Sequence, residues 1–237
     1  LGHDRVMDSM FLDGLEDAYD RGRLMGTFAE DAAQSYQFSR QEQDAYAVAS
    51  LERAVKAGKD GSFAEEITPV KVKSRKGEKT IAIDEQPGKA QLDKIPTLKP
   101  AFREGGTVTA AKSSSISDGA AAVTMMRRSE ADKRGLTPIA TIIGHSTHAS
   151  TPGLFPSAPV GAMNRLLERV GWDAKDVDLW EVNEAFAVVA MIAMRDLGIA
   201  HEKINVHGGA CALGHPIGAS GARIVVTLIS ALRKYGM

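Results

Sequence analysis

The chain has 237 residues, 43% hydrophobic and 25% charged, a composition typical of a globular protein with one or two domains. A formal net charge of −1 gives no overall attraction for nucleic acid or anionic membranes, and no apolar run approaches the roughly 20 residues of a membrane helix. The single cysteine, Cys211, excludes a disulfide within the chain and a cysteine metal cluster, and residues 1–20 lack the pattern of a signal peptide.

Two patterns near the N-terminus predict helix starts. Thr27 with Glu30, and Ser39 with Glu42, have the spacing of a capping box, in which a hydroxyl and a carboxylate accept hydrogen bonds from free amides at a helix start. The predicted helices cover residues 28–38 and 40–57.

The following segment changes to β-branched residues and then to a loop containing prolines. Residues 67–83 alternate around valine and isoleucine, which predicts a hairpin that turns at Lys76 and Gly77. Residues 84–103 hold three prolines without a clear period and are predicted to be loop with one short turn.

From Thr107 onward, short apolar runs alternate with amphipathic segments. Strands are predicted over residues 120–126, 139–143, 177–182 and 204–206, and helices over 129–133, 160–170, 184–197 and 218–235. Gly171 and Gly198 follow two of these helices, at the position where glycine commonly ends a helix. The order predicts an α/β fold, in which ligands bind at strand ends and helix starts.

A glycine-rich loop holds the most specific candidate residue. The run from residue 208 to 221 contains five glycines, which indicates unusual backbone angles or a close approach to a bound group. Within it, His215 lies between Gly214 and Pro216. An imidazole with a pKa near 6.5 accepts a proton at neutral pH, so His215 is a candidate general base. A loop histidine that only caps a helix is an equally good explanation.

Asn183 lies where a predicted strand passes into a predicted helix. Its amide N–H can donate to a developing oxyanion or hold a water that does so, and it can also be a plain helix N-cap. For Glu184 beside it, we prefer a first-turn carboxylate stabilised by the helix dipole over a catalytic acid.

Four groups of residues, in the same order along the chain, resemble motifs of the thiolase family of acyl-CoA acetyltransferases. They are Met25-Gly26-Thr27 with Ala29-Glu30; Ser39-Arg40 with Glu42-Gln43-Asp44; Gly106-Thr107-Val108-Thr109-Ala110 with Ser114 and Asp118-Gly119-Ala120-Ala121; and Val182-Asn183-Glu184-Ala185-Phe186-Ala187 with the 208–221 loop. The resemblance extends over the whole chain. It implies a layered αβαβα thiolase-like fold, present in part, with a C-terminal βαβαβ half beside a helical and hairpin loop domain. The implied boundaries are a loop domain at 1–116, the end of the N-terminal half at 117–138, and an incomplete C-terminal half at 139–237.

The resemblance also implies roles for individual residues. His215 would be the base that activates a nucleophilic cysteine, and Asn183 would hold a water that helps stabilise the thioester oxyanion. Ser114 and Ala110 would contact the pantetheine arm of coenzyme A, and Phe186 would wall the site. Arg75 is the best positional match for a phosphate contact among the basic residues of the hairpin, most of which are better explained as solvated charges.

Two cysteines that the family requires, the nucleophile and a proton-transfer cysteine near the C-terminus, are missing from these residues. Cys211 is interpreted as structural, because a buried cysteine among apolar neighbours is usually inert. The nucleophile is therefore expected to lie outside this chain.

These observations predict a thiolase that transfers acyl groups between acyl-CoA and acetyl-CoA or CoA, with the coenzyme A thioester as substrate and with no cofactor or metal. A non-catalytic acyl-CoA or lipid carrier with the same fold is the alternative. A nucleotide-binding domain is a third possibility, although the glycine spacing does not match a dinucleotide-binding motif. We expect a homo-oligomer, a dimer or a tetramer, without nucleic-acid or membrane partners. A cytoplasmic location is expected, with mitochondria and peroxisomes left open.

Overall fold

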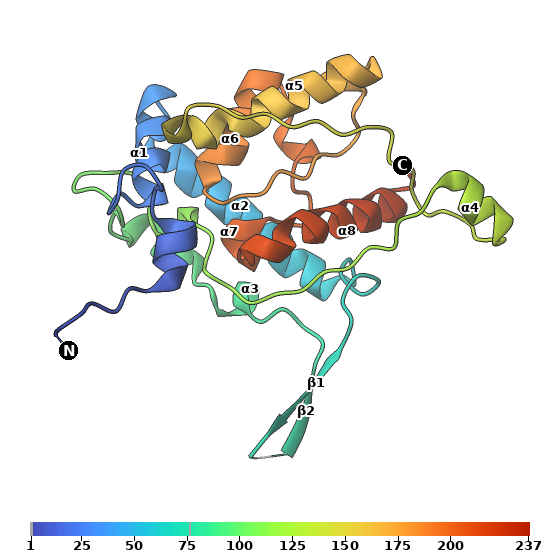
Figure 1. Cartoon of the computed structure of the whole chain (residues 1–237), viewed down its shortest axis with the longest axis horizontal. Helices are drawn as coiled ribbons and strands as arrows, with labels where there is room; N and C mark the ends of the chain where they lie inside the picture. Colours follow the sequence, from blue (N-terminus) through green and yellow to red (C-terminus); the bar gives the residue numbers. More distant parts are fainter. Residues whose placement is uncertain (1, 76) are drawn as a thin grey trace.

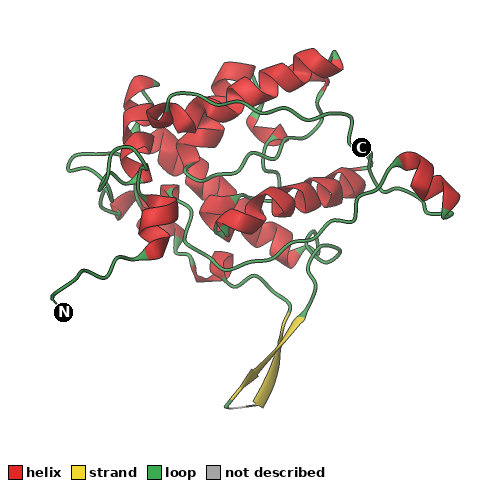
Figure 2. Cartoon of the chain, viewed as in Figure 1, coloured by secondary structure: helices red, strands yellow, loops and turns green. Residues whose placement is uncertain are grey.

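The computed structural model describes residues 2–75 and 77–237 (Figure 1). The helices are α1 (Met25–Ser35), α2 (Arg40–Lys59), α3 (Gln86–Lys89), α4 (Arg128–Lys133), α5 (Ala158–Val170), α6 (Ala187–Leu197), α7 (Ala210–Leu213) and α8 (Ile217–Tyr235). Strands β1 (Val70–Ser74) and β2 (Gly77–Ile81) form an antiparallel pair. Short helical turns of π or 3-10 type cover Phe11–Leu15, Leu92–Thr97, Ala110–Lys112, Pro152–Ser157, Ala174–Asp176 and His201–Lys203. Helices and loops make up most of the chain (Figure 2).

The hydrophobic core forms around α6. Residues 187–193 of this helix are all buried, as expected for a helix that is apolar on every side. Helices α1, α2 and α5 and the Pro152–Ser157 turn contact α6. The core is completed by residues outside these elements, among them Val108, Val182 and Ile204. Helix α6 therefore ties the N-terminal helices to the C-terminal part of the chain.

The structure confirms the capping box at the start of α2. The Ser39 hydroxyl accepts from the Glu42 amide at 3.2 Å, and the Glu42 carboxylate accepts from the Ser39 amide at 2.7 Å. The predicted helix ends at Gly171 and Gly198 are also confirmed, because both glycines adopt the left-handed conformation that follows a helix, with φ of 71° and 66°.

The other capping box is wrong, and α1 starts and ends three residues earlier than predicted. The Thr27 hydroxyl donates to the carbonyl of Leu24 instead of accepting at the helix start. The buried Glu30 carboxylate accepts from the backbone amides of Thr107 and Val108 at distances between 2.8 and 3.0 Å. A partner 77 residues away in sequence thus replaces the local cap.

The predicted hairpin is confirmed. Val70 pairs with Ile81 and Ser74 with Gly77, whose φ of 112° suits a glycine in the turn. Lys76, the other predicted turn residue, lies outside the described residues. The hairpin projects from the packed body in Figure 1, and both of its strands are exposed along their described length.

The four strands predicted after Thr107 are wrong as strands. Residues 120–126, 139–143, 177–182 and 204–206 run as loops, and β1–β2 is the only sheet in the described part of the chain. A single parallel bridge joins Trp180 to Ile204. A strand needs a hydrogen-bonded neighbour, and the first two segments have none: Met125 and Ile139 there are 68% and 69% exposed. The helices of the predicted C-terminal βαβαβ half form, whereas its strands do not pair into a sheet.

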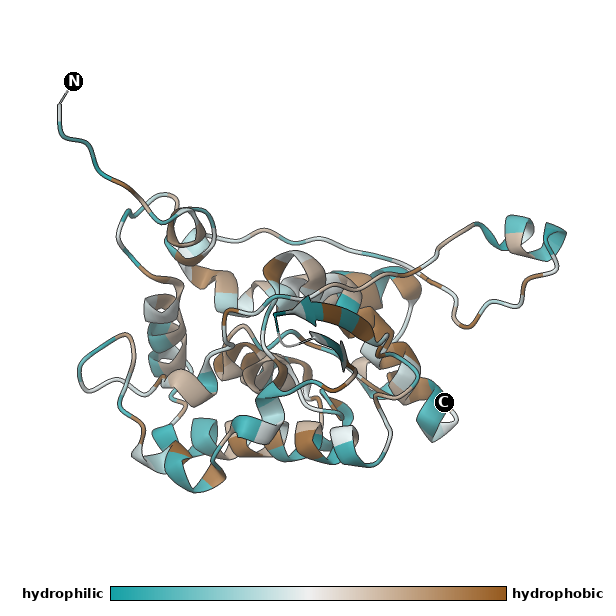
Figure 3. Ribbon diagram, turned by 90° about the horizontal axis from the view of Figure 1, so that it is seen from below, coloured by the Kyte–Doolittle hydropathy of each residue, from teal (hydrophilic) through white to brown (hydrophobic). Residues whose placement is uncertain are grey.

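Polar and apolar residues are mixed on most helices, and the N-terminal tail and α4 extend from opposite ends of the body (Figure 3). Among the residues described, no helix combines the length and apolar character needed to cross a membrane.

Close packing around Glu30 fixes the segment that begins at Gly106. A Cβ atom at position 106 would lie 2.2 Å from Glu30 Oε1, far inside van der Waals contact. Only glycine therefore lets the chain pass the carboxylate that holds the next two amides.

Gly106→Ala is expected to lower the free energy of unfolding by about 1–3 kcal/mol, because the added methyl displaces Glu30 and leaves buried polar groups unpaired. Urea denaturation followed by circular dichroism measures this change. Gly88→Ala is the matched control, since a Cβ at Gly88 meets nothing within 4 Å. Equal losses in the two variants would contradict the importance of the Gly106 contact.

Candidate active site

Three segments that are distant in sequence meet beside α6. The amide and hydroxyl of Ser114 both donate to the carbonyl of Ala185, at 3.1 and 3.0 Å. The amide of His215 donates to the carbonyl of Ser115 at 3.0 Å. The structure therefore brings together the Ser114 segment, the Asn183–Phe186 segment and the glycine-rich loop.

Asn183 and His215 face each other, as the sequence predicts. Asn183 Nδ2 lies 3.3 Å from His215 Nε2, and both residues are partly buried. The N-cap interpretation of Asn183 is wrong, because α6 begins at Ala187 and Phe186 occupies its N-cap position. The Asn183 amide is thus held near the imidazole and is free of a helix-capping role.

The glycine-rich loop carries His215 past the Ser115–Ser117 segment. Gly214 has a φ of 91°, and a Cβ there would lie 2.1 Å from Ser117 Oγ. At the other end of the imidazole, Nδ1 lies 2.6 Å from the hydroxyl of Ser220 on α8. The ring is therefore fixed through both nitrogens and through the backbone on either side.

Glu184 lies in the centre of this region, and sequence reasoning misplaced it. It lies outside α6 and is fully buried, so the interpretation as a first-turn helix carboxylate is wrong. Its carboxylate accepts from Tyr46, Ser50 and Asn205 side chains at 2.8 Å each, and from the Cys211 amide at 3.1 Å. We call these four donors and Glu184 the Glu184 cluster.

The Glu184 cluster connects α2 to the Asn183–Phe186 segment and to the glycine-rich loop. Asn205 also bonds the backbone of Val182, accepting from its amide and donating to its carbonyl at 2.8 Å each. A Cβ at Gly209 would lie 2.2 Å from the Glu184 carboxyl carbon. The adjacent glycines at 208 and 209 are the sequence signal of this close approach, but they do not say what approaches.

Cys211 is structural, as predicted. Its thiol contacts the carbonyl of Glu184 at 3.7 Å, while the two nitrogens of His215 contact other residues. Burial, together with the negative charge of Glu184, raises the pKa of the Cys211 thiol well above its ordinary value. The described residues thus contain no thiol suited to nucleophilic attack.

Electrostatics favour a neutral imidazole at His215. Burial and then the positive charge of Arg223 lower the pKa of His215 below 6.5. Arg223 also lies 3.9 Å from Glu181, whose pKa burial raises to about 8 against the opposing effect of Arg223. At neutral pH the His215 side chain is therefore available to accept a proton.

Phe186, Ala110 and Arg75 are the other residues predicted to bind coenzyme A. Phe186 is buried in the hydrophobic core beside Phe102 and Phe155, with ring centroids 5.8 and 6.4 Å away. Ala110 is exposed at the start of a turn that packs against α2 and α7. Arg75 is exposed at the hairpin turn, which projects away from the body (Figure 1), and the structure does not bring it to His215.

Lys112 points into the body. Its ammonium group is buried and donates to Asp44, to the carbonyl of Arg40 and to the carbonyl of Thr107, at 2.9, 3.1 and 2.8 Å. All three donors are used, so Lys112 anchors the Ser114 segment to α2.

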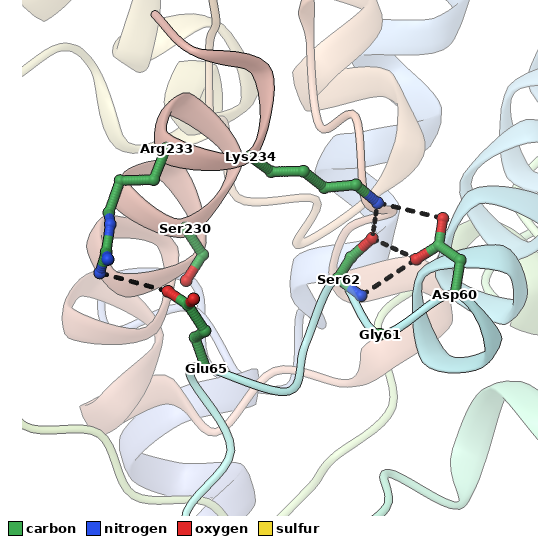
Figure 4. A pocket seen from close by; sticks show the side chains of 7 residues that line it. All are labelled: Asp60, Gly61, Ser62, Glu65, Ser230, Arg233 and Lys234. Carbon is green, nitrogen blue, oxygen red and sulfur yellow. Dashed lines mark hydrogen bonds and ion pairs between the residues drawn. The ribbon is translucent and has the colours of Figure 1, made fainter.

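A polar hollow of about 290 Å³ lies between the end of α8 and the loop after α2 (Figure 4). Lys234 contacts Asp60 and Ser62, and Arg233 contacts Glu65. These charges pair with one another, and the hollow shares no residue with the Asn183–His215 pair.

These features define an α/β protein with a histidine–asparagine centre built from loops around one apolar helix. The family model for the thiolase N-terminal domain matches residues 1–129, and that for the thiolase C-terminal domain matches residues 136–237. The chain belongs to the thiolase family.

Individual relatives agree with this assignment. The acetyl-CoA acetyltransferase of Shinella zoogloeoides is 47% identical over 238 residues, covering 100% of this chain and 60% of the relative. The probable acetyl-CoA acetyltransferase of Dictyostelium discoideum is 46% identical over 241 residues, covering 100% of this chain and 58% of the relative. The chain thus spans less than two thirds of the length of these relatives.

Solved structures confirm the thiolase-like fold. The crystal structure of the Bacillus anthracis acetyl-CoA acetyltransferase has a TM-score of 0.95 at 38% identity, covering 100% of this chain and 60% of that one. The crystal structure of human mitochondrial 3-ketoacyl-CoA thiolase has a TM-score of 0.88 at 35% identity, with the same coverage. The path of the backbone is therefore that of thiolases, although most of the predicted strands are not paired here.

Tyr46→Phe is expected to lower the free energy of unfolding by about 1–3 kcal/mol, because it removes one of the four donors to a buried carboxylate. Thermal or urea denaturation measures the loss. Tyr235→Phe is the control, since the Tyr235 hydroxyl lies 3.4 Å from His207 and its side chain is exposed. A Tyr46→Phe variant as stable as the control would contradict the role of the Glu184 cluster.

Arg223→Gln is expected to raise the pKa of His215. A nearby positive charge disfavours the imidazolium form, so its removal makes protonation easier. The chemical shift of the His215 ring proton, followed by NMR against pH, reports the change. Arg233→Gln is the matched control on α8, because Arg233 pairs with Glu65. An unchanged or lowered pKa in Arg223→Gln would contradict this electrostatic account.

Proposed function

We propose that these residues form the histidine–asparagine part of a thiolase active site that transfers acyl groups between acyl-CoA and acetyl-CoA or CoA. The observation that carries the proposal is the 3.3 Å approach of Asn183 Nδ2 to His215 Nε2 in a chain of this family. The two sequence motifs that contain these residues do not by themselves require this approach. Relatives named as acetyl-CoA acetyltransferases support the same reaction class.

In this proposal, His215 acts as the general base. It draws the proton from a cysteine thiol, and the thiolate attacks the thioester carbonyl to form an acyl-cysteine. Coenzyme A leaves as a thiolate and recovers the proton from His215. The lowered pKa of His215 suits this role, because a base must be unprotonated before it can act.

Asn183 supports the negative charge that develops on the thioester oxygen. Its side chain lies beside the base, and its Oδ1 atom is buried without a hydrogen-bond partner among the described residues. A buried amide oxygen without a partner is uncommon, and a bound water would satisfy it. Such a water, held by Asn183 and near His215, is suited to donate to the oxyanion.

The nucleophilic cysteine is proposed to lie outside these 237 residues. Cys211 is the only cysteine of the chain; it is partly buried, and its thiol lies 3.7 Å from the carbonyl of Glu184. Burial raises its pKa, which keeps it in the unreactive thiol form.

The coenzyme A thioester is proposed to bind as substrate, without a further cofactor. Ser114 and Ala110 would contact the pantetheine arm, Phe186 would wall the acyl end, and Arg75 would approach the phosphates. Ser114 and Phe186 are the best supported, because their segments are joined by the bridge between Ser113 and Phe186. Self-association into a dimer or tetramer, and a cytoplasmic location, are further parts of the proposal.

His215→Asn, made in the full-length gene product that contains these residues, is expected to lower kcat by about 10²- to 10⁴-fold, the usual contribution of a general base. Thiolysis of a 3-oxoacyl-CoA by CoA, followed by the loss of substrate absorbance, measures the rate. His3→Asn is the control, because His3 is exposed near the N-terminus.

A second variant separates the nucleophile from the base. Cys211→Ala is expected to retain turnover, whereas loss of all acyl-enzyme formation in this variant would place the nucleophile at Cys211 instead. Binding of acyl-CoA without any turnover by the unaltered gene product would favour the carrier and contradict the proposed enzyme.

A further inference from the structure

The imidazole of His215 is held at both ring nitrogens. Nε2 lies 3.3 Å from Asn183 Nδ2, and Nδ1 lies 2.6 Å from Ser220 Oγ. A neutral imidazole carries a proton on only one nitrogen, so these two partners together select which nitrogen is the basic one.

The Asn183 side of the ring requires an acceptor. An amide nitrogen donates hydrogen bonds and has no lone pair to accept one. With Asn183 Nδ2 toward the ring, this 3.3 Å contact favours a lone pair on Nε2 and the ring proton on Nδ1, and the partner of Nδ1 adds to that preference.

The Ser220 side gives the same answer from separate geometry. Ser220 is 4% exposed, and its hydroxyl donates to the carbonyl of Pro216 at 3.1 Å. A hydroxyl has a single proton, so Ser220 Oγ offers only lone pairs to its second neighbour, Nδ1. Donation from a helical serine to the carbonyl four residues earlier is a common arrangement, and α8 holds both groups in place.

We infer that Ser220 is a positioning residue, whose hydroxyl accepts the Nδ1 proton of His215 and thereby places the ring lone pair on Nε2, facing Asn183. Ser220 lies on the first turn of a 19-residue helix, while His215 lies in the preceding loop. The helix thus fixes the tautomer of a residue that it does not itself contain.

The consequence for catalysis depends on the acyl-transfer function proposed above, whereas the tautomer itself does not. A base accepts a proton only at the nitrogen that bears its lone pair. Ser220 therefore directs proton transfer to the side of the ring where Asn183 lies, and the opposite tautomer would turn an N–H toward that position.

Nitrogen NMR of the full-length gene product that contains these residues tests the tautomer directly. Correlations between the ring protons and both ring nitrogens distinguish a protonated nitrogen from one with a lone pair, and His215→Asn identifies the signals of His215. The measurement is made at about pH 8, where an imidazole with an ordinary pKa of about 6.5 is neutral. We expect a protonated Nδ1 and an unprotonated Nε2. The reverse assignment would overturn the inference.

Two variants test the contribution of Ser220. Ser220→Ala removes the acceptor and is expected to give a mixture of tautomers, with averaged nitrogen shifts. Ser220→Thr keeps a hydroxyl that bonds the carbonyl four residues earlier in helices, so it is expected to retain the Nδ1–H tautomer. Unchanged nitrogen shifts in Ser220→Ala would overturn the role of Ser220. If Ser220→Ala does not fold, the unaltered chain and Ser220→Thr still decide the question.

Kinetics of the full-length gene product give a second readout. Ser220→Ala is expected to lower kcat by about tenfold or more, but by no more than the 10²- to 10⁴-fold contribution of the general base itself, with KM little changed. Ser220→Thr is expected to restore most of the rate. Ser157→Ala is the control, since that hydroxyl only bonds an exposed turn. A Ser220→Ala effect on KM alone would overturn the positioning role. Absence of turnover in the unaltered protein would reject the proposed function and leave the NMR result to judge the tautomer.

Discussion

The arrangement of the site depends on one buried carboxylate. Burying an ionised group costs several kcal/mol unless hydrogen bonds replace its water, and Glu184 accepts from four donors. The donors to Glu184 hold the segment in place next to Asn183, whose side chain reaches His215. The carbonyl of the next residue, Ala185, is then available to Ser114. The anchored Glu184 side chain therefore helps to fix the positions of Asn183 and Ala185.

Glycines mark the places where these anchors come close to the backbone. The Glu184 carboxyl would collide with a Cβ at position 209, the Ser117 hydroxyl with one at 214, and the Glu30 carboxyl with one at 106. In each case a polar group takes the space of a side chain and bonds nearby amides or hydroxyls. Gly218 and Gly221 have nothing within 4 Å, and nothing in the structure explains them.

The sequence predicts the features that depend on local rules. The Ser39 capping box and the hairpin are present as local rules predict, and the Asn183–His215 contact is present as the family resemblance implies. Predictions fail where a distant partner decides. Glu30 was expected to cap α1 but bonds the amides of Thr107 and Val108 instead. Glu184 was expected in the first turn of α6 but accepts hydrogen bonds from α2 and α7. The strand at 120–126 fails for the opposite reason, since an apolar pattern shows a tendency to pair but cannot supply the neighbour.

Burial has opposite consequences for the His215 imidazole and the Cys211 thiol. For the His215 imidazole, the charged form is the protonated one, so burial lowers its pKa and favours the neutral base. For the Cys211 thiol, the charged form is the deprotonated one, so burial raises its pKa and keeps it unreactive. Burial therefore favours a proton acceptor at His215 and an unreactive thiol at Cys211. The thiolate of the proposed mechanism must therefore come from a residue other than Cys211.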